Sequence, residues 1–235
     1  MSELREAFAV ALQLLAELDG PLWEIVSLSL KVSLGALLPA ALIGLPLGAA
    51  VAVVPFRGRR AAVVALNALM GLPPVVVGLL VYVLLSRQEP LGVALDWLFT
   101  PVAMVLAQAI LLTPIVAALT RQVVEDLWEE YSEELRSLGA GPWRAIPTLL
   151  WDGRYRLPTV LLAGFGRAIA EVGAVMIVGG NIAHVTRVMT TAIVLETSKG
   201  DLALALGLGL VLLMMALLVN TAAALAGGLA RSFEA

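Results

Sequence analysis

Long apolar runs dominate this sequence and leave few folds open to it. Hydrophobic residues make up 60% of the 235 residues and charged residues 14%, whereas soluble domains are about a quarter charged. A membrane-spanning helix needs roughly 20 consecutive apolar residues. Runs of about this length predict five spans, within 22–56 and through roughly 61–85, 98–120, 158–180 and 202–228. The sequence therefore predicts an all-α, polytopic membrane protein.

Prolines and glycines punctuate the first two runs. Pro39 and Pro46 are expected to interrupt the first. In the second, the adjacent Pro73-Pro74 removes two backbone donors and should kink or break the helix. Gly44 and Gly48 lie four residues apart, a spacing of small residues that lets another helix approach closely.

Residues 1–20 are predicted to form an amphipathic helix ahead of the spans. Its shared apolar face consists of Leu4, Phe8, Leu12 and Leu15. The stretch lacks the basic start and long apolar core of a cleaved signal peptide. An interfacial helix fits it best, with a full span as the alternative. Residues 21–235 are then expected to form one transmembrane domain.

One charged stretch, residues 121–158, separates the third run from the fourth. Its acidic residues come first, namely Glu125, Asp126, Glu129, Glu130, Glu133 and Glu134, and Arg136, Arg144, Arg154 and Arg156 follow. An apolar stripe at helical spacing predicts a helix there, formed by Leu127, Tyr131, Leu135 and Leu138. Gly139 is expected to end this helix in the left-handed conformation, and Pro142 to begin a second. We therefore expect two short helices joined at a glycine elbow and forming a docking surface, with a solvated loop as the alternative.

The arginines and lysines predict the orientation of the spans. One side of the membrane receives Arg57, Arg59, Arg60, the arginines of residues 121–158, and Arg231. The other side receives only Arg5, Arg87, Arg187 and Lys199. Because cytoplasmic loops carry the excess of basic residues, the amino terminus is predicted outside and the carboxyl terminus inside. Residues 121–158 are then cytoplasmic.

The fourth run contains two charged residues, Arg167 and Glu171, four positions apart. On a helix they share a face and are predicted to pair. Charges at this depth are costly and suggest a functional site, although a structural pair that locks the helix to its neighbours is an equal alternative.

Several chemistries are missing from the sequence. It has one histidine, His184, which we expect to be an ordinary loop residue, and no cysteine, which disfavours a zinc site. It has no P-loop motif and no hydrolase motif. The sequence thus predicts a protein that is not an enzyme, and energy for uphill transport would come from a partner or an ion gradient.

The charged stretch resembles a known signature. Glu133-Glu134-Leu135 followed by Gly139 resembles the cytoplasmic loop motif E-A-A-x-x-x-G of ABC transporter permeases, with Glu134 and Leu135 in place of the alanines. In that family, a short helix at this loop docks into a groove on a separate ATPase subunit. The resemblance implies an ATPase-coupling role for Glu133, Glu134, Leu135, Leu138, Gly139, Ala140, Gly141, Trp143 and Ile146.

Two further segments narrow the resemblance. Residues 161–201 resemble the carboxyl-terminal half of tungstate-type oxyanion permeases, and molybdate and sulfate permeases share a looser R-x-x-x-E-x-G-A pattern. Residues 71–82 resemble the same group. This implies the permease subunit of an ATP-driven importer for tungstate or a related oxyanion, in a prokaryotic cell membrane. The implied partners are a second copy of this chain, two ATPase subunits that hold the ATP and magnesium, and an extracytoplasmic binding protein. No cofactor of this chain and no nucleic-acid partner are expected.

The translocation path and the substrate stay open at this stage. Candidate path residues are Thr113, Arg167, Glu171, Asn181, Thr190 and Thr191, although threonine and asparagine also cap helices. Alternative functions are a permease for another small solute, such as molybdate, sulfate or an amino acid, and a stand-alone secondary carrier. A membrane-embedded enzyme is the weakest alternative, because its motifs are missing.

Overall fold

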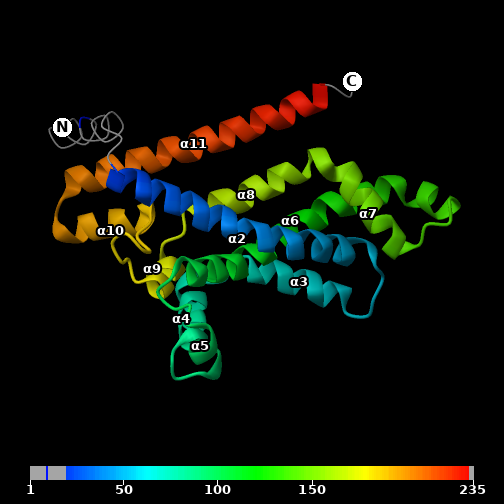
Figure 1. Cartoon of the computed structure of the whole chain (residues 1–235). Helices are drawn as coiled ribbons and strands as arrows, with labels where there is room; N and C mark the ends of the chain where they lie inside the picture. The colour runs from blue at the N-terminus through cyan, green and yellow to red at the C-terminus, as the bar shows by residue number, and fades with distance from the viewer. Residues whose placement is uncertain (1–8, 10–19, 233–235) are drawn as a thin grey trace. The chain divides into compact units, whose positions relative to one another are not determined.

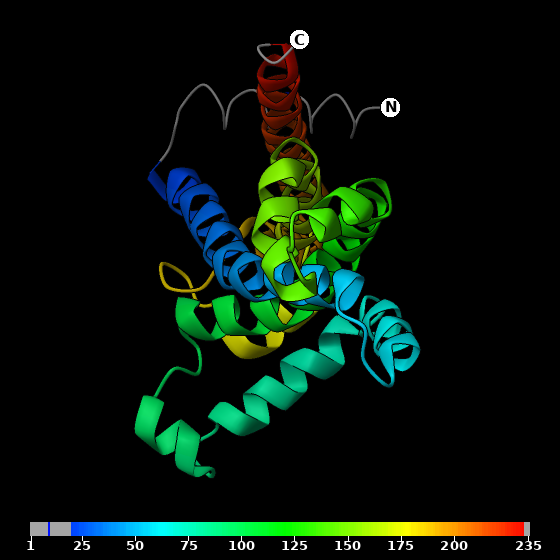
Figure 2. The same ribbon diagram turned by 90° about the vertical axis from the view of Figure 1, so that its right-hand side faces the viewer.

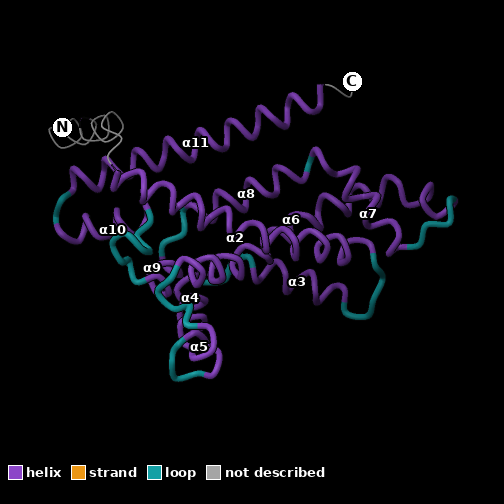
Figure 3. Tube along the Cα trace, viewed as in Figure 1, coloured by secondary structure: helices purple, strands orange, loops and turns teal. Residues whose placement is uncertain are grey.

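The computed structural model describes Ala9 and residues 20–232, with side chains from Leu22 to Thr221 apart from Ala9. Within this part the regular secondary structure is helical, without strands (Figure 3). Three helices are long and apolar enough to cross a membrane, namely α2 (Gly20–Val53), α6 (Pro101–Ser137) and α11 (Leu202–Ser232). The predicted all-α polytopic fold is confirmed. The predicted amphipathic helix of residues 1–20 falls almost wholly outside the described residues.

Two pairs of shorter helices bring the spans to five if each pair counts as one span. These are α3 (Arg59–Leu69) with α4 (Pro74–Leu85), and α8 (Leu157–Ile169) with α9 (Gly173–Gly179). The remaining helices, labelled in Figure 1 where room allows, are α5 (Pro90–Leu95), α7 (Pro142–Asp152), the 3₁₀ turn η1 (Gly153–Tyr155) and α10 (Met189–Lys199).

The chain divides into two compact units. The first holds the described residues up to Gly35, together with Pro73–Gln108 and Gly166–Thr221. The second holds Ala36–Leu72, Ala109–Phe165 and the described residues from Ala222 onward.

In the first unit, α4 packs along α9, where Gly78 permits a close approach. A Cβ at Gly78 would lie 2.7 Å from the Cα of Ala174. The short α5 follows α4 after a tight turn, as Figure 2 shows. A separate apolar cluster joins α2, α10 and α11 and contains Leu22, Met189, Ala192, Leu208 and Val211.

In the second unit, α2 and α6 approach closely through the predicted glycine pair. A Cβ at Gly44 would lie 2.9 Å from Val116 Cβ, and one at Gly48 would lie 2.3 Å from the carbonyl oxygen of Ala117. The predicted role of these glycines in close helix packing is confirmed, and their partner is α6 of the same chain.

Two expectations about helix continuity were wrong. Helix α2 runs through Pro39 and Pro46 without a break, because proline is tolerated in membrane helices when the freed carbonyls are satisfied locally. Helix α6 continues from its apolar part to Ser137, so the first helix of the charged stretch is an extension of the third span. Residues 115–137 contain neither glycine nor proline, and nothing in them stops the helix.

The predicted break at Pro73-Pro74 is confirmed, and the fourth run is broken as well. Helix α3 ends at Leu69 and α4 begins at Pro74. The fourth run is interrupted at residues 170–172, between α8 and α9, although no proline or glycine lies there.

We predict that Gly48→Ala destabilises the protein, whereas Gly209→Ala does not. The added Cβ at position 48 would overlap the Ala117 carbonyl, and overpacking of this kind costs about 1–3 kcal/mol. Apart from its chain neighbours and the nearby backbone of its own helix, no described atom lies within 4 Å of a Cβ built at Gly209. Alanine there should gain up to about 1 kcal/mol from its higher helix propensity. Melting temperatures of the purified variants in detergent test this. Equal melting temperatures for both variants would contradict the described α2–α6 packing.

Candidate functional site

In the second unit, the charged stretch forms two helices joined by a short turn, which we call a helical hairpin. Helix α6 ends at Ser137, and Gly139 then adopts φ 78°, the left-handed conformation predicted for it. The amide of Ala140 donates to the carbonyl oxygen of Leu135 at 2.8 Å, which closes the helix end. Helix α7 begins at Pro142 as predicted. The alternative of a solvated, unstructured loop is therefore wrong.

A buried apolar cluster fixes α7 on the rest of this unit. It joins three helices and consists of Ala49, Ala52 and Val53 of α2, Val124 and Leu127 of α6, and Ala145 and Leu149 of α7. Leu135 and Ile146, two of the predicted coupling residues, pack against this cluster and are half-buried. They hold this helical hairpin in place. The other predicted residues are exposed, apart from Ala140, which is half-buried.

The exposed residues of α6, α7 and the turn between them include both apolar and acidic side chains. Leu138 is 82% exposed, Trp143 is 68% exposed, and Trp151 is 71% exposed. Glu133 and Glu134 are exposed beside them, as are Gly139 and Gly141. Exposed tryptophans are typical anchors of protein interfaces. We call these exposed residues of α6, α7 and the turn between them the α6–α7 surface.

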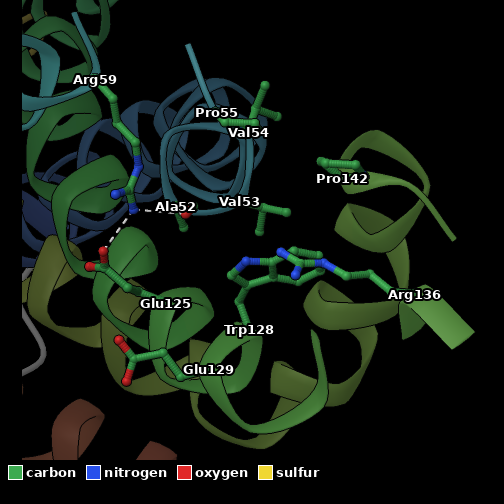
Figure 4. A pocket seen from close by; sticks show the side chains of 10 residues that line it. All are labelled: Ala52, Val53, Val54, Pro55, Arg59, Glu125, Trp128, Glu129, Arg136 and Pro142. Carbon is green, nitrogen blue, oxygen red and sulfur yellow. Dashed lines mark hydrogen bonds and ion pairs between the residues drawn. The ribbon is translucent and has the colours of Figure 1, made fainter. Parts of the chain in front are cut away.

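Arg59, which the sequence analysis counted only among the basic residues on one side of the membrane, links α2 and α6 in this unit. Arg59 donates through Nε to the carbonyl oxygen of Val51 and through Nη2 to that of Ala52, both at 2.8 Å. Its Nη2 also lies 2.7 Å from Oε1 of Glu125 (Figure 4). Arg121 pairs with the other oxygen of that carboxylate. Arg59 thus caps the end of α2 and ties it to α6.

A cavity of about 310 Å³ lies beside this link. Trp128 forms part of its wall, and the guanidinium of Arg136 lies 5.4 Å from the centre of that ring (Figure 4). A cation over an aromatic face is attracted by the ring. Local sequence signals do not find this arrangement, because Arg59 and Glu125 are 66 positions apart.

In the first unit, the predicted pairing of Arg167 with Glu171 is confirmed. Arg167 Nη1 lies 2.5 Å from Oε2 of Glu171, which is 3% exposed. The other carboxylate oxygen of Glu171 accepts the amide of Ala174 at 3.1 Å. The arginine is 36% exposed, so the pair has one buried and one accessible partner.

The hydroxyl residues proposed for a path already make hydrogen bonds with the backbone. Thr113 donates to the carbonyl of Ala109 at 2.7 Å, and Thr190 donates to the carbonyl of Glu171 at 2.9 Å. Thr191 accepts the amide of Val188 at 3.0 Å and caps α10. Asn181 adopts φ 51°, in the turn that follows α9. These bonds agree with the capping alternative, and a role in transport stays a prediction.

His184 lies in a loop, where it was expected. Its Nδ1 is 2.7 Å from Oε2 of Glu24, and the histidine side chain is exposed whereas that of Glu24 is half-buried. Among the residues that the structure describes, no three histidine, aspartate or glutamate side chains are placed to hold a metal ion.

The sequence is similar to permeases of known transport systems along most of its length. It is 40% identical over 220 residues to the tungstate uptake system permease protein TupB of Peptoclostridium acidaminophilum, covering 94% of this chain and 96% of that protein. It is 39% identical to a probable anion ABC transporter permease protein of Haloferax volcanii, over 84% of this chain and 87% of the relative. It is 31% identical to the molybdenum transport system permease protein ModB of Escherichia coli, over 78% and 84%. No family model matches the sequence.

The multi-span helical fold and these relatives define the class of the protein as a permease subunit of an ABC transporter. Within this class, the chain belongs to the family of tungstate and molybdate permeases.

We predict that Arg59→Ala destabilises the protein and that Arg57→Ala does not. Arg59 makes three charge-assisted hydrogen bonds, and losing such bonds should cost about 1.5–3 kcal/mol. Arg57 is exposed in the turn just before α3 and serves as the matched control. Melting temperatures in detergent provide the measurement, and a double-mutant cycle with Glu125→Ala isolates the pair. A zero coupling energy between positions 59 and 125 would show that the pair does not tie the two helices.

Proposed function

We propose that this chain is the permease subunit of an ATP-driven importer for tungstate or a related oxyanion. The observation that carries the proposal is the 40% identity to a tungstate uptake permease over 94% of the chain. Molybdate is the second candidate, because relatives from molybdenum transport systems are 31% identical over about four fifths of the chain.

The α6–α7 surface is proposed to dock a separate ATPase subunit. Its support is structural. Leu138 and Trp143 are exposed, and the helices that carry this surface, α6 and α7, are packed together with α2 by a buried apolar cluster. The ATP and magnesium would bind to that partner, and this chain would contribute no hydrolytic site. Because α6 runs from Pro101 to Ser137 as one helix with Pro114 inside it, a movement imposed at its docking end would reach its apolar part through the same helix.

The remaining partners and the orientation belong to the same proposal. Two copies of this chain would surround the path, two ATPase subunits would bind in the cytoplasm, and an extracytoplasmic binding protein would deliver the oxyanion. The amino terminus would lie outside and the carboxyl terminus in the cytoplasm, in a prokaryotic cell membrane. The distribution of arginine and lysine supports this orientation.

Within the membrane, the accessible guanidinium of Arg167 is the proposed path group best suited to a dianion. Its charge is balanced by Glu171 at 2.5 Å, so the resting protein carries no unpaired charge there. The other proposed path residues have weaker support, namely Thr113, Asn181, Thr190 and Thr191. The three threonines already form hydrogen bonds with backbone groups.

The test is ATP hydrolysis by the reconstituted complex of this permease, its ATPase and its binding protein. We expect tungstate to stimulate hydrolysis at a lower concentration than molybdate or sulfate. If none of the three anions stimulates hydrolysis in an assembled complex, the proposal that the substrate is an oxyanion is wrong. Failure to bind any ATPase would overturn the permease function.

In the same assay, Trp143→Ala should abolish the stimulation, because truncating an interface anchor typically weakens association by tenfold or more. Trp23→Ala is the matched control, since Trp23 is similarly exposed, at 62%, and lies outside the α6–α7 surface. Equal stimulation of both variants would exclude Trp143 from the docking contact.

A further inference from the structure

The break in the fourth span exposes backbone groups that need partners within the protein. At residues 170–172 the α-helical hydrogen bonds are interrupted between α8 and α9, apart from a bond from the Glu171 amide to the carbonyl oxygen of Ala168 at 3.1 Å. A bilayer offers no water to replace the missing bonds. Side chains from two other helices supply donors. Gln108 Nε2 of α6 donates to the carbonyl oxygen of Ala168 at 3.1 Å, and Thr190 Oγ1 of α10 donates to that of Glu171 at 2.9 Å.

A small polar cavity lies next to this break, within the first unit. Five polar side chains line it, all of them more than nine-tenths buried, namely Ser29, Ser33, Gln108, Glu171 and Thr190. The cavity leaves about 10 Å³ for the centre of a water-sized sphere. This is about the least space that holds one water molecule, and a water there also needs two to four polar partners.

One residue that lines this cavity has a buried acceptor without a partner. Gln108 is 3% exposed, and its Oε1 has no hydrogen-bond partner among the described residues. The amide cannot simply turn over, because its oxygen would then face the carbonyl oxygen of Ala168, and neither atom can donate. Two hydroxyl protons at the cavity are already used, that of Ser29 on the Ile25 carbonyl and that of Thr190 on the Glu171 carbonyl.

The charge balance at the cavity disfavours an ion. Among the described residues that line it, Glu171 alone carries a charge. That charge is balanced by Arg167, and both carboxylate oxygens already accept hydrogen bonds. A cation would therefore add an unbalanced charge in a low-dielectric region, and a tetrahedral oxyanion is too large for the space of one water.

We propose that this cavity is a hydration site, in which one buried water donates a hydrogen bond to Oε1 of Gln108. The water completes the polar contacts around the break and links α2 and α6 to it, through Ser33 and Gln108. It is a positioning element that keeps the broken span in one conformation. The inference concerns the chain alone and does not depend on the proposed substrate.

A substitution that fills the cavity distinguishes a cavity that holds a water molecule from one that is empty. Ser33→Val places two methyl groups at the cavity wall, expels the water and leaves Oε1 of Gln108 unpaired. We expect the apparent melting temperature of the full-length protein in nanodiscs to fall by about 4 °C, while Ser33→Ala changes it little. If the cavity were dry, Ser33→Val would instead raise the melting temperature above that of Ser33→Ala, and this result would overturn the proposal.

A second variant tests whether Ser33→Val lowers the melting temperature by steric overlap alone and not by expelling water. Gln108→Met removes the unpaired acceptor at nearly constant shape, so adding Ser33→Val to it should cost less than adding Ser33→Val to the parent. An equal cost in both backgrounds would overturn the link between Ser33 and Gln108. Melting in sodium, potassium and choline chloride at equal ionic strength should be identical. A specific rise with sodium or potassium would show a cation site in place of a water.

Discussion

Every backbone amide and carbonyl inside a bilayer needs a partner within the protein, and the described chain is arranged around this requirement. The unbroken helices satisfy it largely internally, except that Pro39 and Pro46 each remove one backbone donor from α2. At the first break, the amides of Met70, Gly71 and Leu72 donate to carbonyls three or four residues earlier. At the second break, side chains from α6 and α10 complete the bonding.

The same requirement separates the two kinds of charged residue in this protein. Glu171 is buried and has both a cationic partner and an amide donor, which an isolated charge in hydrocarbon would lack. In the charged stretch, by contrast, Glu133 and Glu134 are exposed and need no internal partner. Arg59 and Glu125 are intermediate in burial, since each side chain is about one third exposed, and they form an ion pair with each other. The α6–α7 surface is thereby held to α2 by one ionic link and one apolar cluster.

Local signals in the sequence predicted the features that depend on neighbouring residues. The spans, the break at Pro73-Pro74, the left-handed Gly139 and the start of α7 at Pro142 all follow from nearby composition. The pairing of Arg167 with Glu171 followed from their spacing of four.

The features that sequence patterns missed depend on distant contacts. The bond from Gln108 to Ala168 joins positions 60 apart, and the pair Arg59–Glu125 joins positions 66 apart. The break at residues 170–172 carries no proline or glycine. Its stability comes from tertiary partners, which no local pattern reveals. The continuity of α6 was missed because its charges suggested a boundary, whereas a helix ends only where the backbone is stopped.

The most direct test of the account is whether an ATPase covers the α6–α7 surface. The sequence contains no cysteine, so a single Leu138→Cys substitution can be labelled with a maleimide without background. Leu138 is 82% exposed, and Trp23→Cys at a 62% exposed position provides the control. Adding the partner ATPase should slow labelling at position 138 by at least about tenfold and leave position 23 unchanged. Unchanged labelling at position 138 in an assembled complex would contradict the account.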